Sequence, residues 1–181
     1  MDMHTMPPAS AKQGASKTAK VSPRSARQPA KKARPQTLGL ENFGELYRAA
    51  PMARIERLKQ GIPAAYIVFV ADKMAMSRDR LIKQLAIPRS TLERKIRSGQ
   101  DLATDQAERV LGVSRLVGQV QALVQASGDP AGFDAGAWVG QWMDHPNPAL
   151  GGQRPGSLMD TVLGQELVSS VVAQMTGHTC A

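Results

Sequence analysis

The chain has 181 residues, a net charge of +8 and only 4% aromatic residues, which suits one domain or two small ones with an aliphatic core. No apolar run approaches the roughly 18 residues that span a bilayer, and the N-terminus lacks the apolar segment of a secretory signal. Cys180 is the only cysteine, which excludes an internal disulfide and fits a reducing compartment. We therefore expect a cytoplasmic protein that makes no contact with membranes.

The charges are unevenly divided along the chain. Residues 1–38 carry eight Lys or Arg and one acid, and residues 72–98 carry eight and three, whereas residues 99–181 carry three Lys or Arg and eight acids. A basic front half suits a polyphosphate such as DNA, because each neutralised phosphate releases condensed counterions. The acidic back half indicates a second partner of a different kind.

Residues 1–38 are predicted to form a disordered basic tail, because they contain almost no large apolar residues and cannot offset the entropy of ordering. The tail either adds loose phosphate contacts or only raises solubility. A transit peptide is also conceivable, but the five prolines from Pro7 to Pro35 disfavour the amphipathic helix that it needs.

Three helices are expected after the tail. Phe43 begins the first pattern, and Pro51 begins a second that ends at Gly61. The second helix is expected to turn its apolar side chains inward, namely Met52, Ile55 and Leu58. Pro63 begins a third helix, whose broad apolar face predicts a platform for the next two helices: Tyr66, Ile67, Phe69, Val70 and Met74. No strand alternation or hairpin turn is sustained, so we predict an all-α fold.

Residues 77–99, SRDRLIKQLAIPRSTLERKIRSG, predict two short helices joined by a tight turn. Ser77 is a good N-cap, Pro88 favours a helix start and Gly99 suits a left-handed cap. Basic side chains are expected to face outward from both helices, with Arg80 and Lys83 on the first. This is the layout of a helix-turn-helix, whose second helix enters the major groove. Arginine pairs with guanine, and Ser or Thr bonds bases or phosphates, so the candidate DNA contacts are Arg78, Arg89, Ser90, Thr91, Arg94, Lys95 and Arg97. The alternative is a helical hairpin with a solvated basic face.

A long helix is predicted from Thr104, as its cap, to Ala126. Valines step along it by three and four, at positions 110, 113, 117, 120 and 124. This stripe is either an ordinary core face or the seam of a dimer that reads two half-sites, and we favour the seam slightly.

The back of the chain predicts a third set of helices. Asp129 or Asp134 caps one that carries Trp138 and Trp142 on one side; such a pair is typical of a core, but at a surface it would be a strong interface anchor. A turn rich in Pro and Gly follows, and Pro155 opens a short helix. Asp160 or Thr161 caps the last helix, whose apolar face is formed by Val168, Val171, Val172 and Met175.

Motifs for catalysis, metals and cofactors are absent. His4, His145 and His178 are scattered, and no carboxylate or Cys180 lies near them at metal-ligand spacing. Gly151-Gly152 lacks the Lys-Ser or Lys-Thr of a phosphate-binding loop. The sequence therefore predicts a binding protein with no metal and no cofactor, rather than an enzyme.

Residues 77–93 resemble the helix-turn-helix of Xre-type repressors, with Ala86 where that family usually has glycine. The back segment resembles the toxin-binding domain of Xre/MbcA/ParS-type antitoxins. This second resemblance is carried by Trp138, Pro146 to Gly152, Arg154-Pro155, Leu158 to Thr161, Gly164 and Val168. Together the two resemblances cover residues 45–178.

The resemblance implies a bacterial antitoxin whose partner is a RES-type toxin, which consumes NAD or transfers ADP-ribose from it. The C-terminal domain would obstruct the toxin's NAD pocket, while the helix-turn-helix represses the operon from operator DNA in the nucleoid. The implied toxin-binding residues are Trp138, Trp142, Pro146, Asn147, Gly151, Gly152, Arg154, Pro155 and Leu158. We accordingly divide the chain into a tail (1–38), a helix-turn-helix domain (39–126) and a toxin-binding domain (127–181), acting as a homodimer or as a hetero-oligomer with toxin.

Two other functions remain open from the sequence. One is a stand-alone helix-turn-helix regulator whose back domain only dimerises or senses a ligand. The other is a nucleoid protein that coats DNA without sequence preference through its basic tail.

Overall fold

The computed structural model describes residues 38–128 and 131–175, so the predicted tail lies almost wholly outside the described residues. The described parts are helical and their only bridge is an isolated pair between Pro63 and Asp101, which confirms the all-α prediction. The α-helices are α1 (Phe43–Arg48), α2 (Pro51–Lys59), α3 (Tyr66–Lys73), α4 (Arg78–Gln84), α5 (Arg89–Arg97), α6 (Thr104–Ala126), α7 (Ala135–Trp142) and α8 (Val162–Gln174). Two short 3₁₀ turns, η1 (Pro148–Leu150) and η2 (Pro155–Leu158), join α7 to α8.

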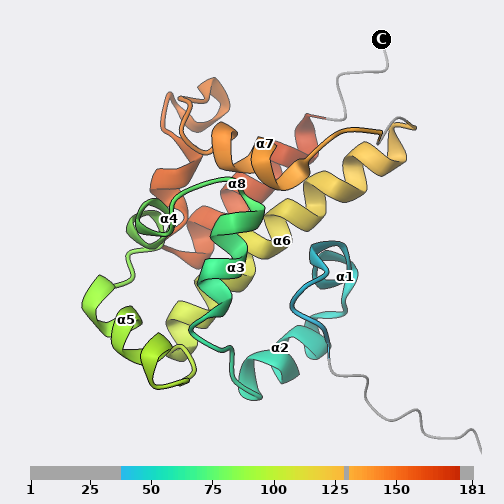
Figure 1. Ribbon diagram of the computed structural model, residues 1–181. Helices are drawn as coiled ribbons and strands as arrows, with labels where there is room; N and C mark the ends of the chain where they lie inside the picture. Colours follow the sequence, from blue (N-terminus) through green and yellow to red (C-terminus); the bar gives the residue numbers. More distant parts are fainter. Residues whose placement is uncertain (1–37, 129–130, 176–181) are drawn as a thin grey trace, which may run out of the picture. The chain divides into compact units, whose positions relative to one another are not determined.

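The long helix α6 is the centre of the core, and it contacts α1, α2, α3, α7 and α8 (Figure 1). Its valines at 110, 113, 117 and 120 are at most 4% exposed within the single chain. The dimer-seam interpretation was therefore wrong, because helices of the same chain already cover this stripe. A valine stripe at three- and four-residue spacing is compatible with either kind of burial, and the packing around α6 decides between them.

Three of the predicted helix caps are confirmed by side-chain hydrogen bonds. Ser77 accepts from the backbone N–H of Arg80 at 3.3 Å, Asp134 caps α7 and Thr161 caps α8. The prediction for Thr104 was wrong, because α6 begins at this residue and Ala103 precedes it.

Helix α2 does not bury its apolar face as the sequence predicted. Met52 is 62% exposed and Ile55 is 40% exposed, and only Leu58 packs partly against the core. Met175, expected on the buried face of α8, is also 41% exposed. Both helices are amphipathic, but nothing within residues 38–128 and 131–175 covers these particular side chains.

The predicted platform role of α3 is confirmed for the first of the two motif helices, α4, whereas α5 is not among the helices that α3 mainly contacts. Tyr66, Ile67 and Val70 are buried on α3, and Met74 is buried directly after it. The helix packs against α4 and α6. The hydroxyl of Tyr66 donates to the carbonyl oxygen of Leu40 at 2.7 Å and lies 3.0 Å from Ser114 Oγ on α6. The burial of this phenol raises its pKa to about 12.

Candidate functional site

Helices α4 and α5 form the two arms of the predicted helix-turn-helix. Leu81 and Leu85 on the α4 side and Leu92 on α5 are buried, and the N–H of Ile87 donates to the carbonyl of Ile82 at 2.9 Å to close the turn. Ala86 makes the reversal with a φ of 48°, a left-handed conformation that costs an alanine more than a glycine. The turn geometry is thus kept even though alanine stands at this position.

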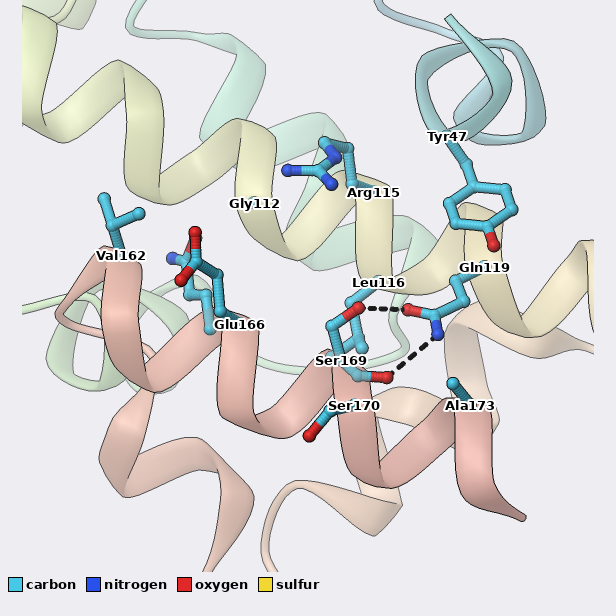
Figure 2. Close-up of a pocket in the computed structure, with 11 residues that line it drawn as sticks. Tyr47, Gly112, Arg115, Leu116, Gln119, Val162, Glu166, Ser169, Ser170 and Ala173 are labelled. Carbon is cyan, nitrogen blue, oxygen red and sulfur yellow. Dashed lines mark hydrogen bonds between the residues drawn. The ribbon is translucent and has the colours of Figure 1, made fainter. Parts of the chain in front are cut away.

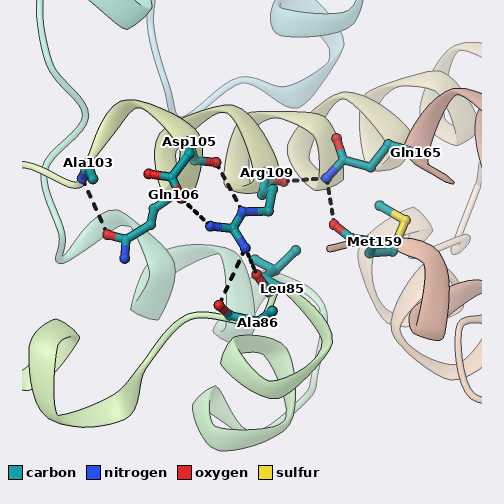
Figure 3. Close-up of polar contacts among 8 residues, drawn as sticks. All are labelled: Leu85, Ala86, Ala103, Asp105, Gln106, Arg109, Met159 and Gln165. Carbon is teal, nitrogen blue, oxygen red and sulfur yellow. Dashed lines mark hydrogen bonds and ion pairs between the residues drawn. The ribbon is translucent and has the colours of Figure 1, made fainter. Parts of the chain in front are cut away.

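Arg109 of α6 holds this turn in place (Figure 3). Its Nη1 donates to the carbonyl oxygens of Leu85 at 2.7 Å and Ala86 at 3.3 Å. Its Nη2 pairs with Asp105 one turn earlier at 2.5 Å, and the side chain is only 14% exposed. The sequence interpretation missed Arg109; the only local signal was the four-residue spacing from Asp105, which is common on solvated helices.

The side chains predicted to contact DNA differ in their accessibility. Arg89, Ser90, Arg94 and Arg97 are exposed on α5, whereas Arg78, Thr91 and Lys95 are half-buried. The ammonium group of Lys95 donates to the carbonyl oxygen of Asp101 at 2.6 Å. The exposed cations of α5 are therefore all arginines, namely Arg89, Arg94 and Arg97.

Two carboxylates orient the first arginine of α5. Arg89 lies 2.9 Å from Asp79 of α4 and 2.8 Å from Glu93, and Glu93 lies 3.6 Å from Arg78. The hydrogen bond from Arg89 lowers the pKa of Glu93 and raises that of Arg89. Charge-assisted pairs of this kind hold a guanidinium in a defined direction.

Arg80 departs from the expected outward-facing basic surface. Its Nη2 donates to the carbonyl oxygen of Gly140 on α7 at 2.9 Å and pairs with Asp144. Asp144 also accepts from Gln84 Nε2 at 3.0 Å. This part of the prediction was wrong, because Arg80 joins α4 to the end of α7 instead of facing outward with Lys83.

Helix α7 presents its tryptophans as a stacked pair. The rings of Trp138 and Trp142 lie 5.6 Å apart with an interplanar angle of 11°, and both are half-buried. Gly136 and Gly140 occupy the opposite side, where a Cβ would lie 2.0 Å from Lys73 O and 2.2 Å from Met74 O. This close approach of α7 to the end of α3 turns the tryptophan face toward the surface.

An apolar hollow of about 270 Å³ adjoins Trp138. It is lined by the last turns of α6 and α8 and by the loop before α7, and it includes Val124, Phe133 and Met175. Phe133 is 41% exposed and its ring lies 6.3 Å from that of Trp138. Aromatic side chains that are only partly covered by the core, next to a hollow, are typical anchors of protein interfaces.

The turn after α7 is organised by Asn147. Its side chain accepts from the N–H of Ala149 at 2.9 Å, and its backbone carbonyl accepts from Leu150 and Gly152, each at 3.0 Å. Gly151 and Gly152 both have positive φ, 63° and 81°, which explains the glycine pair. Asn147 and the two glycines thus fix the shape of the loop.

The remaining predicted toxin contacts differ in exposure. Pro146 and Arg154 are exposed, Leu158 is half-buried, and Pro155 is buried at the start of η2. Arg154 lines a polar hollow of about 620 Å³ together with Arg80, Asp144 and Asp160.

Neither metal-binding clusters nor membrane helices are found in the part of the chain that the structure describes. No group of three or more His, Cys, Asp or Glu side chains is placed to hold a metal ion there. No helix within residues 38–128 and 131–175 is long and apolar enough to cross a membrane.

Comparison with known proteins supports both the helix-turn-helix domain and the C-terminal toxin-binding domain. Residues 53–115 match the antitoxin Xre-like helix-turn-helix domain, and residues 131–177 match the antitoxin Xre/MbcA/ParS C-terminal toxin-binding domain. A protein of Sphingobium sp. (strain YBL2), described as "Prs ADP-ribosylating antitoxin", is 38% identical over 133 residues, which is 74% of this chain and 84% of the relative. The chain therefore belongs to the Xre/MbcA/ParS family of antitoxins.

Proposed function

We propose that this protein neutralises an ADP-ribosylating toxin of the RES type by obstructing its NAD pocket, and that it represses its own operon through α5. The observation that carries the proposal is the similarity to a relative whose name refers to ADP-ribosylation, over most of that relative's length. The family resemblance implies a toxin of the RES type, and toxins of this type consume NAD or transfer ADP-ribose from it. On this proposal the protein acts by binding and not as an enzyme.

The DNA-binding half of the proposal rests on α5. Arg89, Arg94 and Arg97 are exposed there, and the turn before α5 is braced by Arg109. Arginines at the start of such a helix meet base edges, while later ones meet phosphates. We assign operator recognition to Arg89, Ser90 and Arg94, with Arg78, Thr91, Lys95 and Arg97 in supporting contacts.

The toxin-binding half rests on the tryptophan surface. We define this surface as Phe133, Trp138 and Trp142 with the adjoining loop of residues 146–154. Stacked aromatic side chains that are only half-buried supply a large contact area at low entropic cost. Pro146 and Arg154 offer contacts from the loop, whereas Asn147, Gly151, Gly152 and Pro155 support its shape.

Charge complementarity favours the same pairing. Residues 131–175 contain four carboxylates and one arginine. A toxin pocket that binds the phosphates of NAD is expected to be basic, so an acidic partner domain would be attracted to it.

The experiment is an NAD-consumption assay on the purified product of the adjacent reading frame. Addition of the full antitoxin is expected to stop NAD loss at a fixed stoichiometric ratio. A toxic neighbour that consumes no NAD would refute the RES assignment, and a consuming enzyme that is not inhibited would refute neutralisation. Binding of the antitoxin to its own promoter, compared with a shuffled sequence, tests repression separately.

A further inference from the structure

The polar hollow beside α4 lies where the helix-turn-helix meets the toxin-binding domain. Its lining includes three residues of α4, two that follow α7 and four in or near η2, and its volume is about 620 Å³. Sites that bind small ligands have volumes of about 300–1,000 Å³. A ligand held here would therefore contact both domains at once.

Polar contacts fix the walls of this hollow. Arg80 Nη2 donates to the carbonyl oxygen of Gly140 at 2.9 Å, and Gln84 Nε2 donates to Asp144 at 3.0 Å. Gly156 of η2 comes close to the same helix, since an added Cβ there would lie 2.5 Å from Gln84 Nε2. Because the hollow is already formed, binding does not have to bear the entropy of ordering it.

Positive charge prevails among the side chains of the hollow. Three cations and two carboxylates line it, namely Arg80, Lys83, Arg154, Asp144 and Asp160. Asp144 is already paired with Arg80. Lys83, Arg154 and Asp160 are exposed and form no ion pair within residues 38–128 and 131–175. Two cations and one carboxylate thus remain available to a ligand.

Two buried polar atoms of α4 also lack partners in the part of the chain that the structure describes. They are Arg80 Nε and Gln84 Oε1, and both residues line the hollow. Most buried polar groups in proteins are hydrogen-bonded, and an ion or a water is one source of a missing partner. An anion oxygen suits the N–H of Arg80, and a water or a ligand hydroxyl suits the carbonyl oxygen of Gln84.

The hollow between α6 and α8 differs in its charges. Arg115 and Glu166 are its charged lining residues, one of each sign (Figure 2). Its walls are joined by Gln119 Nε2, which donates to Ser169 O at 2.9 Å, and by Ser169 Oγ, which donates to Gln119 Oε1 at 2.6 Å (Figure 2). Balanced charges give no preference for an anion, so the polar hollow beside α4 is the better candidate for one.

We propose that the polar hollow binds a phosphate group through Lys83 and Arg154. Lys83 belongs to the matched helix-turn-helix and Arg154 to the matched toxin-binding domain, and both side chains are of the types that bind phosphate. The first helix of a helix-turn-helix crosses the DNA backbone, so a backbone phosphate of the operator is one source. This source rests on the function proposed for α5, whereas the other source, a free nucleotide, does not.

Fluorescence anisotropy with operator DNA over a series of salt concentrations tests the first source. The double variant Lys83→Ala/Arg154→Ala is expected to reduce the slope of log affinity against log salt by about 0.9, the value for one phosphate contact. Its preference for operator over shuffled DNA is expected to stay, because phosphate contacts carry no sequence information. Lys59→Ala is the matched control, since Lys59 is an exposed cation of α2 outside the hollow. An equal reduction in the control would overturn the DNA contact.

Calorimetric titration of the full chain with ADP, without DNA, tests the second source. On this source ADP is expected to bind, whereas adenosine, which lacks phosphate, is not. The double variant is expected to weaken ADP binding at least about tenfold, because two charge-assisted contacts are lost. Asp160→Asn is expected to strengthen it, because a carboxylate that repels the phosphate is removed.

The two titrations separate the outcomes, with circular dichroism to confirm that each variant is folded. A reduced salt slope without ADP binding assigns the site to DNA, and ADP binding with an unchanged slope assigns it to a free nucleotide. An unchanged slope together with no ADP binding would overturn the phosphate site, as would ADP binding that the double variant retains in full. A wild type that does not bind operator DNA would instead refute the function proposed for α5, and the ADP titration alone would then decide the hollow.

Discussion

Gln84 of α4 and Asp144, which follows α7, are joined by a hydrogen bond of 3.0 Å, and Arg80 pairs with the same carboxylate. The carboxylate of Asp144 thus interacts with two side chains of the first helix of the helix-turn-helix. The domain proposed to bind DNA and the domain proposed to bind toxin are therefore held together by a specific polar contact.

Asp144→Ala is expected to destabilise the protein by about 1 kcal/mol, because Arg80 and Gln84 lose an acceptor while both partners of the ion pair remain partly solvated. Urea unfolding measures the change. Asp160→Ala is the control, since Asp160 lines the same hollow but is exposed and is expected to change stability by less than about 0.5 kcal/mol. Equal losses in the two variants would show that the contact contributes nothing specific.

Arg94→Ala and Arg89→Ala are each expected to weaken operator binding by about 1–3 kcal/mol, because a guanidinium that contacts a base is removed. Fluorescence anisotropy with operator and shuffled DNA measures both affinity and discrimination. Toxin binding by these variants should equal that of the wild type. Unchanged operator affinity in both variants would contradict the assignment of α5 as the recognition helix.

Ala86→Gly is expected to stabilise the protein by about 0.5–1 kcal/mol, because glycine relieves the left-handed strain at a φ of 48°. Gly99→Ala is the reverse control, because it adds a Cβ at a residue whose φ is +61°. Nothing lies within 4 Å of this Cβ, so any change in stability comes from backbone strain alone. We expect that variant to lose about 1 kcal/mol. Thermal unfolding of both variants tests the argument, and a destabilised Ala86→Gly would contradict it.

The raised pKa of Tyr66 predicts a loss of folding stability at alkaline pH. Its pKa is raised to about 12 in the folded protein from 10.0, so the unfolded chain releases this proton first. The stabilisation that comes from keeping Tyr66 protonated is complete below pH 10. It amounts to roughly 2–3 kcal/mol and is lost between about pH 10 and 12.

Tyr66→Phe isolates this group from the other titrations. Below pH 10 the variant should be less stable than the wild type by about 1 kcal/mol, through loss of the bond to Leu40 O. The difference should shrink and then reverse as the pH approaches 12. A difference in unfolding free energy that stays constant from pH 8 to 12 would contradict the assignment.

Local signals in the sequence predicted the helices well. Capping residues such as Ser77, prolines at helix starts and apolar spacing depend only on near neighbours along the chain. The apolar spacing predicted a helix from Thr104 to Ala126, which are the bounds of α6, although Thr104 is its first residue and not its cap. The all-α fold follows from the same signals. The family resemblance added the two domain types, which the comparisons confirmed.

Contacts between distant segments were not predictable in the same way. Arg80 and Lys83 look alike as basic residues of one helix, and only the position of α7 separates Arg80 from the basic surface. Similarly, the apolar stripe of α2 carries no sign that Met52 and Ile55 remain uncovered. Burial depends on which helices pack over a face, and sequence periodicity does not specify them.

We propose that toxin neutralisation depends on the tryptophan surface and not on α5. The most direct measurement is growth of cells that express the adjacent reading frame together with the wild type, Arg94→Ala or Trp142→Ala at equal soluble levels. We expect rescue by the wild type and by Arg94→Ala, and much weaker rescue by Trp142→Ala. A harmless adjacent gene, or equal rescue by Trp142→Ala, would contradict it.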